Sequence, residues 1–419
     1  MNFTGNFQKS VFKRHFQITL GKMLQTQQKT DECVQLPYMR AANVGDGSLN
    51  LDDLNDMWFT PRDVRQYTLS EGDLLVLEGG DVGRSAIMQK VEGTIGFQNS
   101  VHRVRPRKHN LNPFGQYWLN HLKSSGYFDL VCSKATLSHF TVEKFLETPF
   151  PNIGFEQQKA IADYLDRETG RIDGLIEKKT RFIALLKEKR AAVIDHAVTK
   201  GVDRNAEMKP SGVEWIGDIP AHWDAPRIAT LFREAFREPD PDLPVLSVSI
   251  HNGVSDGELS DEERDRKVAL SEDRTKYQGV EPGDLVYNMM RAWQGAFGAV
   301  AVSGLVSPAY VVARPIAEFR TKFLEHLLHT KSAAEEIRRY SRGIADFRMR
   351  LYWDYFRDIR VCLPPLPEQD EILSHIDRET ARIQGLIEKT ERSIALLKEK
   401  RAALITAAVT GKIDVRAAA

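Results

Sequence analysis

Residues Asp166–Thr199 read DRETGRIDGLIEKKTRFIALLKEKRAAVIDHAVT, and residues Asp377–Thr410 read DRETARIQGLIEKTERSIALLKEKRAALITAAVT. The two stretches align without a gap, 211 residues apart, and about three quarters of the aligned positions are identical. Self-similarity at a fixed offset is the sequence signature of an internal duplication. A chain of 419 residues is also long enough for more than one hydrophobic core. We therefore expect two copies of one unit.

Each repeat has the pattern of a long helix. No proline interrupts residues 157–199, where Ala, Leu, Lys, Glu and Arg dominate. Apolar residues recur at heptad spacing, as in a coiled coil. Gly201 and Gly411 stand where glycine commonly ends a helix. The expected seam of the helix pair consists of Ile172, Ile176, Ile183, Leu186 and Val193 in the first copy and Ile383, Ile387, Ile394, Leu397 and Leu404 in the second.

The segments outside the repeats are much less alike but share short landmarks. Gly72-Asp73-Leu74 and Gly283-Asp284-Leu285 each join a turn to an apolar run, which predicts a buried strand. We also expect strands at Leu36–Met39 and Leu243–Leu246, and short helices at Phe114–Lys123 and Phe323–Lys331. The predicted fold class is α/β, with two mixed α/β domains separated by two long helices that form an antiparallel intramolecular coiled coil.

The duplication also predicts the order of domains along the chain. A seam on one helix buries little alone, and its best partner is its own copy in the same chain. The expected parts are a globular domain (1–154), a helix (155–201), a connecting segment (202–223), a second globular domain (224–363) and a second helix (364–412).

Two strings resemble a known family. PPLPEQDEILSHIDRETARIQGLIEKTERSIALLKEKRAALITAAVTGKID (364–414) and KPSGVEWIGDIPAHWDAPRI (209–228) look like the conserved regions of Type I restriction-modification specificity subunits. The resemblance covers both helices, the connecting segment and both variable blocks. The first half departs from the pattern, because it begins NFTGNFQKSVFKRH without a counterpart of PSGVEWIGDIPAHW. We therefore expect a differently built N-terminal edge.

The resemblance implies two target recognition domains that each read one half of a bipartite, asymmetric site in double-stranded DNA. It implies that the helix pair sets the number of unread base pairs between the halves. Two DNA adenine methyltransferase subunits, which bind S-adenosylmethionine, would join the chain. Motor-nuclease subunits that use ATP and Mg²⁺ would complete a restriction complex. The chain itself would be non-catalytic, cytoplasmic and without a cofactor.

Charge must be judged locally, because Lys plus Arg and Asp plus Glu both number 58. A DNA-binding protein is usually basic, so either DNA is not the ligand, or the positive charge is local or comes from a partner. Both globular blocks contain segments rich in Arg, Asn and Gln, the side chains that pair with base edges. We predict DNA contacts by Arg84, Gln98, Asn99, Arg103, Arg105 and Arg107 in the first block and Arg291, Trp293, Gln294, Arg342, Arg348 and Arg350 in the second.

Each of these segments also has a plainer interpretation. The basic run from Arg103 to Lys108, interleaved with Val101 and Val104, fits an ordinary half-exposed strand. The LLKEKR stretches at 185–190 and 396–401 fit the solvated faces of a coiled coil. A coiled-coil adaptor with two protein-binding domains is the alternative function, and the neutral net charge favours it mildly.

The sequence contains no complete catalytic motif of the amino-methyltransferase, GxxxxGK[ST] or HExxH kind. Ser307-Pro308-Ala309-Tyr310 resembles an amino-methyltransferase loop but lacks the second proline, and no GxxxxGK[ST] or HExxH motif is present. The acidic group Asp256, Glu258, Asp261, Glu262 and Glu263 lies in a polar stretch typical of a solvated loop. Cys33, Cys132 and Cys362 are widely spaced, which favours buried structural thiols in a reducing compartment. No apolar run is long enough to cross a membrane, and the N-terminus has no signal-peptide pattern.

Overall fold

A computed structural model describes residues 5–132, 139–250, 253–260, 262, 273–343 and 349–415. The chain divides into two units: residues 1–180 with 391–419 form unit 1, and residues 181–390 form unit 2. Each unit therefore combines one globular part with a portion of both long helices, α6 (Phe155–Lys200) and α11 (Leu366–Val409).

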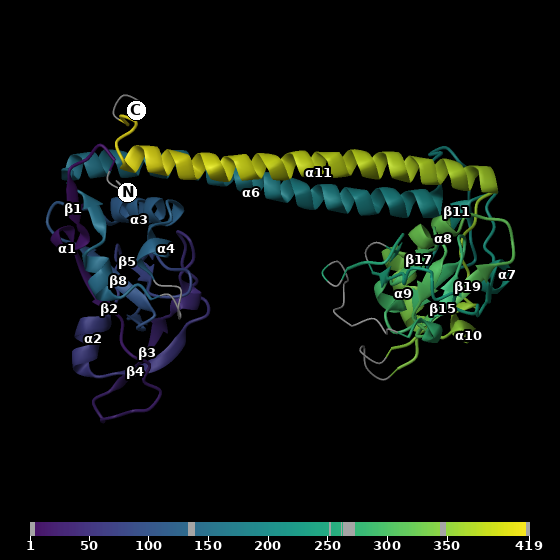
Figure 1. The fold of residues 1–419 in the computed structure, drawn as a ribbon, viewed down its shortest axis with the longest axis horizontal. Coiled ribbons are helices and arrows are strands. Elements are labelled where there is room, and N and C mark those ends of the chain that lie inside the picture. Colours follow the sequence, from purple (N-terminus) through teal and green to yellow (C-terminus); the bar gives the residue numbers. More distant parts are fainter. Residues whose placement is uncertain are drawn as a thin grey trace. The chain divides into compact units, whose positions relative to one another are not determined.

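The two helices lie side by side (Figure 1) and pack antiparallel within each unit. In unit 1, Leu165 shares a hydrophobic cluster with Val409, and Asp173 forms an ion pair with Arg401 at 2.9 Å. Residue numbers thus rise along α6 while those of the neighbouring residues in α11 fall, as in an antiparallel pair. In unit 2, Leu186 clusters with Ile383 and Ile387. The predicted antiparallel helix pair is confirmed.

The predicted seam residues are all buried or half-buried. Ile172, Leu186, Ile383 and Ile387 are buried, and the others are half-buried. Both helices end as predicted, because Gly201 and Gly411 adopt the left-handed conformation (φ +78° and +68°) that lets a chain leave a helix. Lysines and glutamates of the LLKEKR stretches are exposed, as on a solvated face.

The globular part of unit 1 contains a four-stranded antiparallel sheet in the order β2-β8-β5-β6 and a three-stranded sheet in the order β4-β3-β7. Its elements are β1 (Lys9–Val11), α1 (Phe12–His15), β2 (Phe16–Leu20), β3 (Val34–Met39), β4 (Asn55–Phe59), α2 (Pro61–Tyr67), β5 (Leu74–Leu77), β6 (Ser85–Ile87), β7 (Gly96–Phe97), β8 (Val101–Pro106), α3 (Asn112–Ser124), α4 (Tyr127–Val131), α5 (Val142–Leu146) and β9 (Pro149–Pro151). Phenylalanines and Trp118 fill the core between the sheet, α3 and the long helices.

The globular part of unit 2 repeats the four-stranded sheet, in the order β12-β19-β16-β17. Its elements are β10 (Met208–Pro210), β11 (Asp218–Pro220), α7 (Ile228–Leu231), β12 (Phe232–Glu234), β13 (Val248–Ser249), β14 (Gly253–Val254), β15 (Gln278–Val280), β16 (Leu285–Asn288), β17 (Phe297–Ala299), β18 (Gly304–Val306), β19 (Tyr310–Pro315), α8 (Thr321–Leu328), α9 (Lys331–Tyr340) and α10 (Trp353–Phe356). All four strands occupy matching places in both sheets: numbered along the chain within each sheet, the spatial order is first, fourth, second, third in both units. The duplication therefore extends to the globular parts.

Individual hydrogen bonds repeat as well. The buried Gln158 side chain accepts from the backbone N–H of Leu111 at 3.0 Å, just before α3. Its counterpart Gln369 accepts from the backbone N–H of Arg320 at 2.7 Å, just before α8. Each glutamine thereby ties the start of a globular helix to the start of a long helix. Because the N–H groups at a helix start lack partners within the helix, a side-chain acceptor there stabilises both units in the same way.

The two units differ where the chain enters them. In unit 2 the strands β10 and β11 form a hairpin, and Trp223 follows, fully buried beside Gly201. In unit 1, Phe7 lies against Gly411, and the backbone N–H of Asn6 donates to the carbonyl oxygen of Thr410 at 3.0 Å. A short segment with one aromatic ring thus covers the end of α11. The predicted difference at the N-terminal edge is confirmed.

Two local predictions were wrong. Leu243–Leu246 forms no strand, only an isolated bridge from Val245 to Leu305, because Pro244 has no N–H to pair. The helix expected over 323–331 ends at Leu328. Thr330 then accepts from the backbone N–H of Ala333 at 3.3 Å and caps the next helix, α9.

Candidate nucleic-acid interface

In unit 1, four segments meet at one end of the four-stranded sheet. Strands β2 and β5 both run antiparallel to β8, so the segments that follow them leave the sheet at the end where β8 begins. We call this surface the unit 1 loop end, made of residues 21–25, 40–43, 78–84 and 98–100. Hydrogen bonds join the segments: Gln98 N–H donates to Met39 O at 2.9 Å, and Ala41 N–H donates to Ser100 Oγ at 3.1 Å.

Three predicted contact residues lie in the unit 1 loop end. Arg84, Gln98 and Asn99 are half-buried, and the Arg84 guanidinium approaches the carbonyl oxygen of Ala41 at 3.5 Å. The structure thus brings together side chains that are 14 residues apart in the sequence. It also places Arg40 in the same loop end, paired with Asp53 at 2.9 Å. Arg40 belongs to no basic run, so the sequence offered no signal for it.

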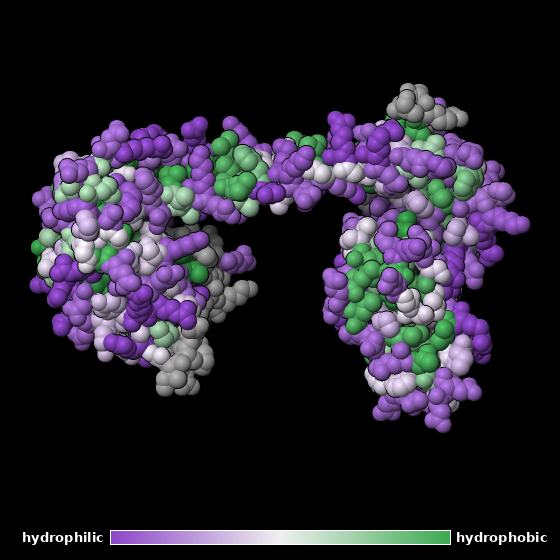
Figure 2. Space-filling model, turned by 180° about the vertical axis from the view of Figure 1, so that it is seen from behind, coloured by the Kyte–Doolittle hydropathy of each residue, from purple (hydrophilic) through white to green (hydrophobic). Residues whose placement is uncertain are grey.

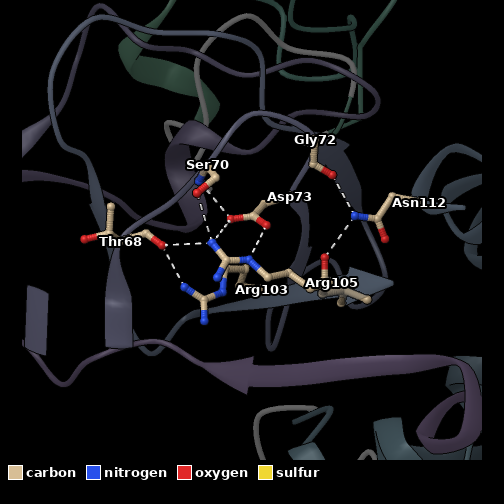
Figure 3. A network of polar contacts seen from close by, with 8 residues as sticks. Thr68, Ser70, Gly72, Asp73, Arg103, Arg105 and Asn112 are labelled. Carbon is tan, nitrogen blue, oxygen red and sulfur yellow. Dashed lines mark hydrogen bonds and ion pairs between the residues drawn. The ribbon is translucent and has the colours of Figure 1, made fainter. Parts of the chain in front are cut away.

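Arg103 and Arg105 lie outside the loop end, in strand β8, and hold the turn before β5 (residues 68–73) to the sheet (Figure 3). Arg105 donates from Nε and Nη2 to the two carboxylate oxygens of Asp73, at 2.6 and 2.8 Å. Arg103 is buried and donates to the carbonyl oxygen of Thr68 at 2.7 Å. Burial lowers the pKa of Arg103, whereas the hydrogen bond to Asp73 raises the pKa of Arg105. Both guanidinium groups are already occupied within the fold.

The second unit places the same residue types together, but as an ion pair without a hydrogen bond between them. Arg314 approaches Asp284 at 3.9 Å, and these residues are the counterparts of Arg105 and Asp73. In both units an Arg-Pro pair ends the strand and a Gly-Asp pair precedes its neighbour. Because the two units share this pair although their sequences differ widely, we infer that it serves the fold that they share. The sequence therefore contained a signal for the structural role of Arg105, and the basic run concealed it.

Arg107 lies at the opposite end of β8 from the loop end. Its backbone N–H donates to the carbonyl oxygen of His15 at 2.8 Å, and its side chain is exposed. The run from Arg103 to Lys108 thus begins as a strand, as its plainer interpretation suggested, and continues away from Arg84 and Gln98. The residues of this run do not form one surface with the unit 1 loop end.

In unit 2, the segment between β16 and β17 (289–296) is the counterpart of residues 78–84 and contains three predicted residues. Arg291 donates from Nε to the side-chain oxygen of Gln294 at 3.0 Å. The guanidinium of Arg338 lies over the Trp293 ring, 5.4 Å from its centroid. This segment therefore places a cation, an amide and an aromatic ring side by side.

A second segment adjoins it, because Leu351 N–H donates to the carbonyl oxygen of Met289 at 2.8 Å. There Arg342 and Arg350 pair through their backbones, and the Arg342 guanidinium lies 4.6 Å from the ring centroid of Tyr355. We call this set the unit 2 basic-aromatic surface: Arg291, Trp293, Arg338, Arg342, Arg350 and Tyr355. Arg348, also predicted, lies outside the described residues. Tyr355 was missed, because nothing in the sequence marks its stacking on an arginine 13 residues earlier.

The chemistry of these two surfaces suits nucleic acid. An arginine stacked on an aromatic ring is held in a fixed orientation and keeps its N–H groups for phosphate or guanine. Gln and Asn side chains match the hydrogen-bonding edge of adenine. Trp and Tyr rings offer faces on which bases or sugars can stack. The two units thus present different side chains on the same framework.

Other chemistry finds no comparable cluster. Within the described part of the chain, no group of three or more His, Cys, Asp or Glu side chains could hold a metal ion, and no helix is long and apolar enough to cross a membrane. Of the acidic stretch, Asp261 and Glu263 lie outside the described residues, and Glu258 pairs with Arg274 at 3.0 Å. Cys33, Cys132 and Cys362 are free thiols and are buried, as predicted.

Arg84 and Arg105 allow the loop end to be separated from the fold by measurement. We expect Arg84→Ala to weaken sequence-specific DNA binding about tenfold or more and to leave the thermal midpoint unchanged. Arg105→Ala should instead lower the free energy of unfolding by about 1–2 kcal/mol, because Asp73 stays buried without its partner, and should keep the site preference. Equal effects of both variants on site preference would contradict this assignment.

Comparisons with known proteins agree with the duplicated architecture. No protein-family model and no curated protein matches the sequence. Two solved structures share the fold over nearly the whole chain. One is a chain of a type I R-M system, described for its complex assembly and conformational transition, with a TM-score of 0.63, 12% identity and coverage of 95% of this chain and 98% of that chain. The other is the HsdS subunit from Thermoanaerobacter tengcongensis, with a TM-score of 0.50, 13% identity and coverage of 95% and 97%. The fold of this chain is that of Type I restriction-modification S subunits.

Proposed function

We propose that this chain is the DNA-specificity subunit of a Type I restriction-modification complex and that each unit reads one half of a bipartite, asymmetric site. One observation carries the proposal. Each unit has a four-stranded sheet of the same topology, and each sheet carries a different polar surface at the corresponding end. A framework that is kept while its loops change is what two readers of different base sequences need. The shared fold with S subunits supports the same conclusion.

In this proposal the two units read DNA by different side chains. Arg84, Gln98 and Asn99 of the unit 1 loop end contact base edges in one half-site. The unit 2 basic-aromatic surface contacts the other half-site through arginines held on aromatic rings. The local positive charge of these surfaces accounts for DNA binding by a chain without net charge. The chain supplies recognition, and the chemistry belongs to its partners.

The helix pair has two roles in the proposal. It sets the number of unread base pairs between the half-sites, and it docks two copies of a DNA adenine methyltransferase subunit. Figure 2 shows hydrophobic patches among the charged residues along the helices. On the helices, unit 1 exposes Leu175 and Leu396, and unit 2 exposes their repeat counterparts, Leu386 and Leu185. An exposed apolar pair that occurs twice by duplication suits two copies of one partner. S-adenosylmethionine, ATP and Mg²⁺ would be bound by the methyltransferase and motor-nuclease subunits.

Docking can be tested at the two most exposed leucines of these pairs. Leu185 and Leu396 are 52% and 65% exposed, each followed after one residue by a lysine, Lys187 or Lys398. Leu185→Glu with Leu396→Glu should weaken binding of both methyltransferase copies about tenfold or more, because each loses a buried apolar contact. Met208→Glu, at an exposed position of the β10-β11 hairpin, is the matched control. A complete two-to-one complex of unchanged affinity in native mass spectrometry would rule out this face.

The proposed function is tested by a salt titration of DNA binding by the assembled complex. We expect a preferred duplex to bind more tightly than a scrambled one at every salt concentration, with both affinities falling as salt rises. The preference, and not the affinity alone, is the decisive quantity. Equal binding to preferred and scrambled duplexes throughout would contradict the proposal and favour a coiled-coil adaptor.

A further inference from the structure

Unit 1 displays two large apolar side chains beside its proposed base-reading amides. Met23 is 75% exposed and Leu24 is 50% exposed, and both lie in residues 21–25 of the unit 1 loop end. Among the large hydrophobic residues described in unit 1, Met23 is the most exposed. Its neighbour Lys22 accepts through its carbonyl oxygen from the backbone N–H of Asn99 at 2.9 Å. The apolar pair thus directly follows a residue bonded to a proposed base reader.

The segment is held firmly on both sides of this pair. Lys22 N–H donates to Phe97 O at 3.0 Å, and the Lys22 ammonium lies 2.9 Å from Asp63. On the other side, Gln25 is buried and its carbonyl oxygen accepts from Trp58 N–H at 3.0 Å. An anchored backbone that directs two apolar side chains into water is a built feature of the fold. It differs in this respect from scattered surface leucines, which need no explanation.

Unit 2 has a comparable feature near the corresponding strand end. Phe236 is 72% exposed, more than any other large hydrophobic residue described in that unit, and lies two residues beyond β12. In the register of the two sheets it aligns with Leu20, three residues before Met23. It too lies between two backbone anchors: Ala235 N–H donates to Val312 O at 2.9 Å, and Gly279 N–H donates to Arg237 O at 3.0 Å. Because β12 and β16 run in the same direction, Phe236 leaves the sheet at the same end as Arg291.

We propose that Met23 with Leu24 in unit 1, and Phe236 in unit 2, are wedges that insert between stacked base pairs of the half-site that each unit reads. This inference rests on the proposed function. Met, Leu and Phe are among the side chains that DNA-binding proteins insert into base steps, where they partly unstack the duplex. Different apolar residues, shortly after the corresponding first strand of each sheet, are expected if each reader has its own wedge for its own sequence.

Position and chemistry together favour DNA over the other occupants. A core role is excluded by the exposure of these side chains, and the leucines of the proposed methyltransferase contact lie on the helices instead. The apolar tips stand at the sheet ends that carry Gln98 and Arg291. A duplex that meets those residues therefore lies within reach of the wedges. Insertion would remove the apolar surface from water and would make site preference depend on how easily a base step opens.

The experiment uses the assembled complex of the full chain with its methyltransferase partner and a duplex of about 30 base pairs carrying the site found by methylation mapping. 2-Aminopurine is placed at successive steps of each half-site, because its fluorescence rises when it is unstacked. We expect a rise at one step of the unit 1 half-site for the wild type. Met23→Ser with Leu24→Ser should abolish it and weaken binding about tenfold or more. Phe236→Ser should do the same in the other half-site only.

Two further measurements give the result its meaning. A mismatch at the responding step should restore most of the lost affinity, because an unpaired step costs less to open. Ile316→Ser is the matched control, since Ile316 is 54% exposed but follows β19 at the opposite end of the same sheet. Specific binding with an unchanged fluorescence rise in the serine variants would overturn the wedges while leaving the proposed function intact. An altered subunit stoichiometry in native mass spectrometry would instead identify these residues as a protein contact and would also overturn them. A wild-type complex without site preference would overturn the proposed function itself.

Discussion

Two residues inserted after Arg190 should abolish the folded chain, whereas four residues inserted there should leave it folded and lengthen the spacer of the recognised site. Each residue turns an α-helix by 100°, so two residues rotate everything that follows by about 200°. In unit 2, Ala197 and Val198 pack in the same core as Ile372 and Ile376. The rotation would turn these residues away from α11 and expose the core, and we expect the loss of soluble protein.

Four residues, by contrast, make a little more than one turn and keep the seam within about 40° of its original direction. They add about 6 Å to α6, and DNA rises about 3.4 Å per base pair, so the proposed spacer should lengthen by one or two base pairs. The half-sites should stay the same, because no loop residue changes. Soluble yield and thermal unfolding test the first insertion, and mapping of methylated adenines tests the second. An unchanged spacer with full activity would mean that the helices do not set the distance.

Trp223→Ala should lower the free energy of unfolding of unit 2 by about 3–5 kcal/mol, the range for removal of a fully buried tryptophan. Trp223 is completely buried, and its Nε1 donates to Glu368 at 3.0 Å. Glu368 also contacts His222 Nε2 at 2.6 Å, near the start of α11. The substitution therefore leaves a cavity and removes a donor from a carboxylate that is mostly buried.

Thermal and denaturant unfolding of the full chain measure this loss. Trp293→Ala is the matched control, because Trp293 is half-buried in the unit 2 basic-aromatic surface. It should cost much less stability but weaken DNA binding. A loss below about 1 kcal/mol for Trp223→Ala would show that the connecting segment does not hold unit 2 together.

The long helices could be predicted from the sequence because the features that determine them lie within each helix segment itself. Heptad spacing, the absence of proline beyond the first turn and a glycine after the C-terminal end define α6 and α11 without reference to the rest of the chain. The repeat itself supplied the partner for each seam. The apolar pattern at Leu243–Leu246 led to the wrong prediction of a strand. Its side chains pack into two separate hydrophobic clusters, and its backbone forms no strand ladder. The residues are packed into the core, but the predicted backbone pairing of a strand is missing.

The candidate interface was only partly predictable, because loops meet through long-range pairing. Arg84 and Gln98 lie together since β5 and β8 are neighbours, which the sequence does not state. Conversely, Arg103 and Arg107 are close in sequence, yet one is buried beside Thr68 and the other is exposed at the far end of the strand. Comparison of the two copies is more informative than charge alone. It distinguishes the structural role of Arg105, which has a counterpart in Arg314, from the proposed DNA-contacting role of Arg84.

The measurement that tests the central claim most directly is genome-wide mapping of methylated adenines in cells that carry this chain with its methyltransferase partner. The wild type should direct methylation to one bipartite, asymmetric sequence. A second chain, in which residues 1–150 come from another specificity subunit, should change one half-site and keep the other half-site and the spacer. The same pattern of methylated adenines with and without the chain would contradict the proposed function. A change in both half-sites after the exchange would contradict the claim that the two units read DNA independently.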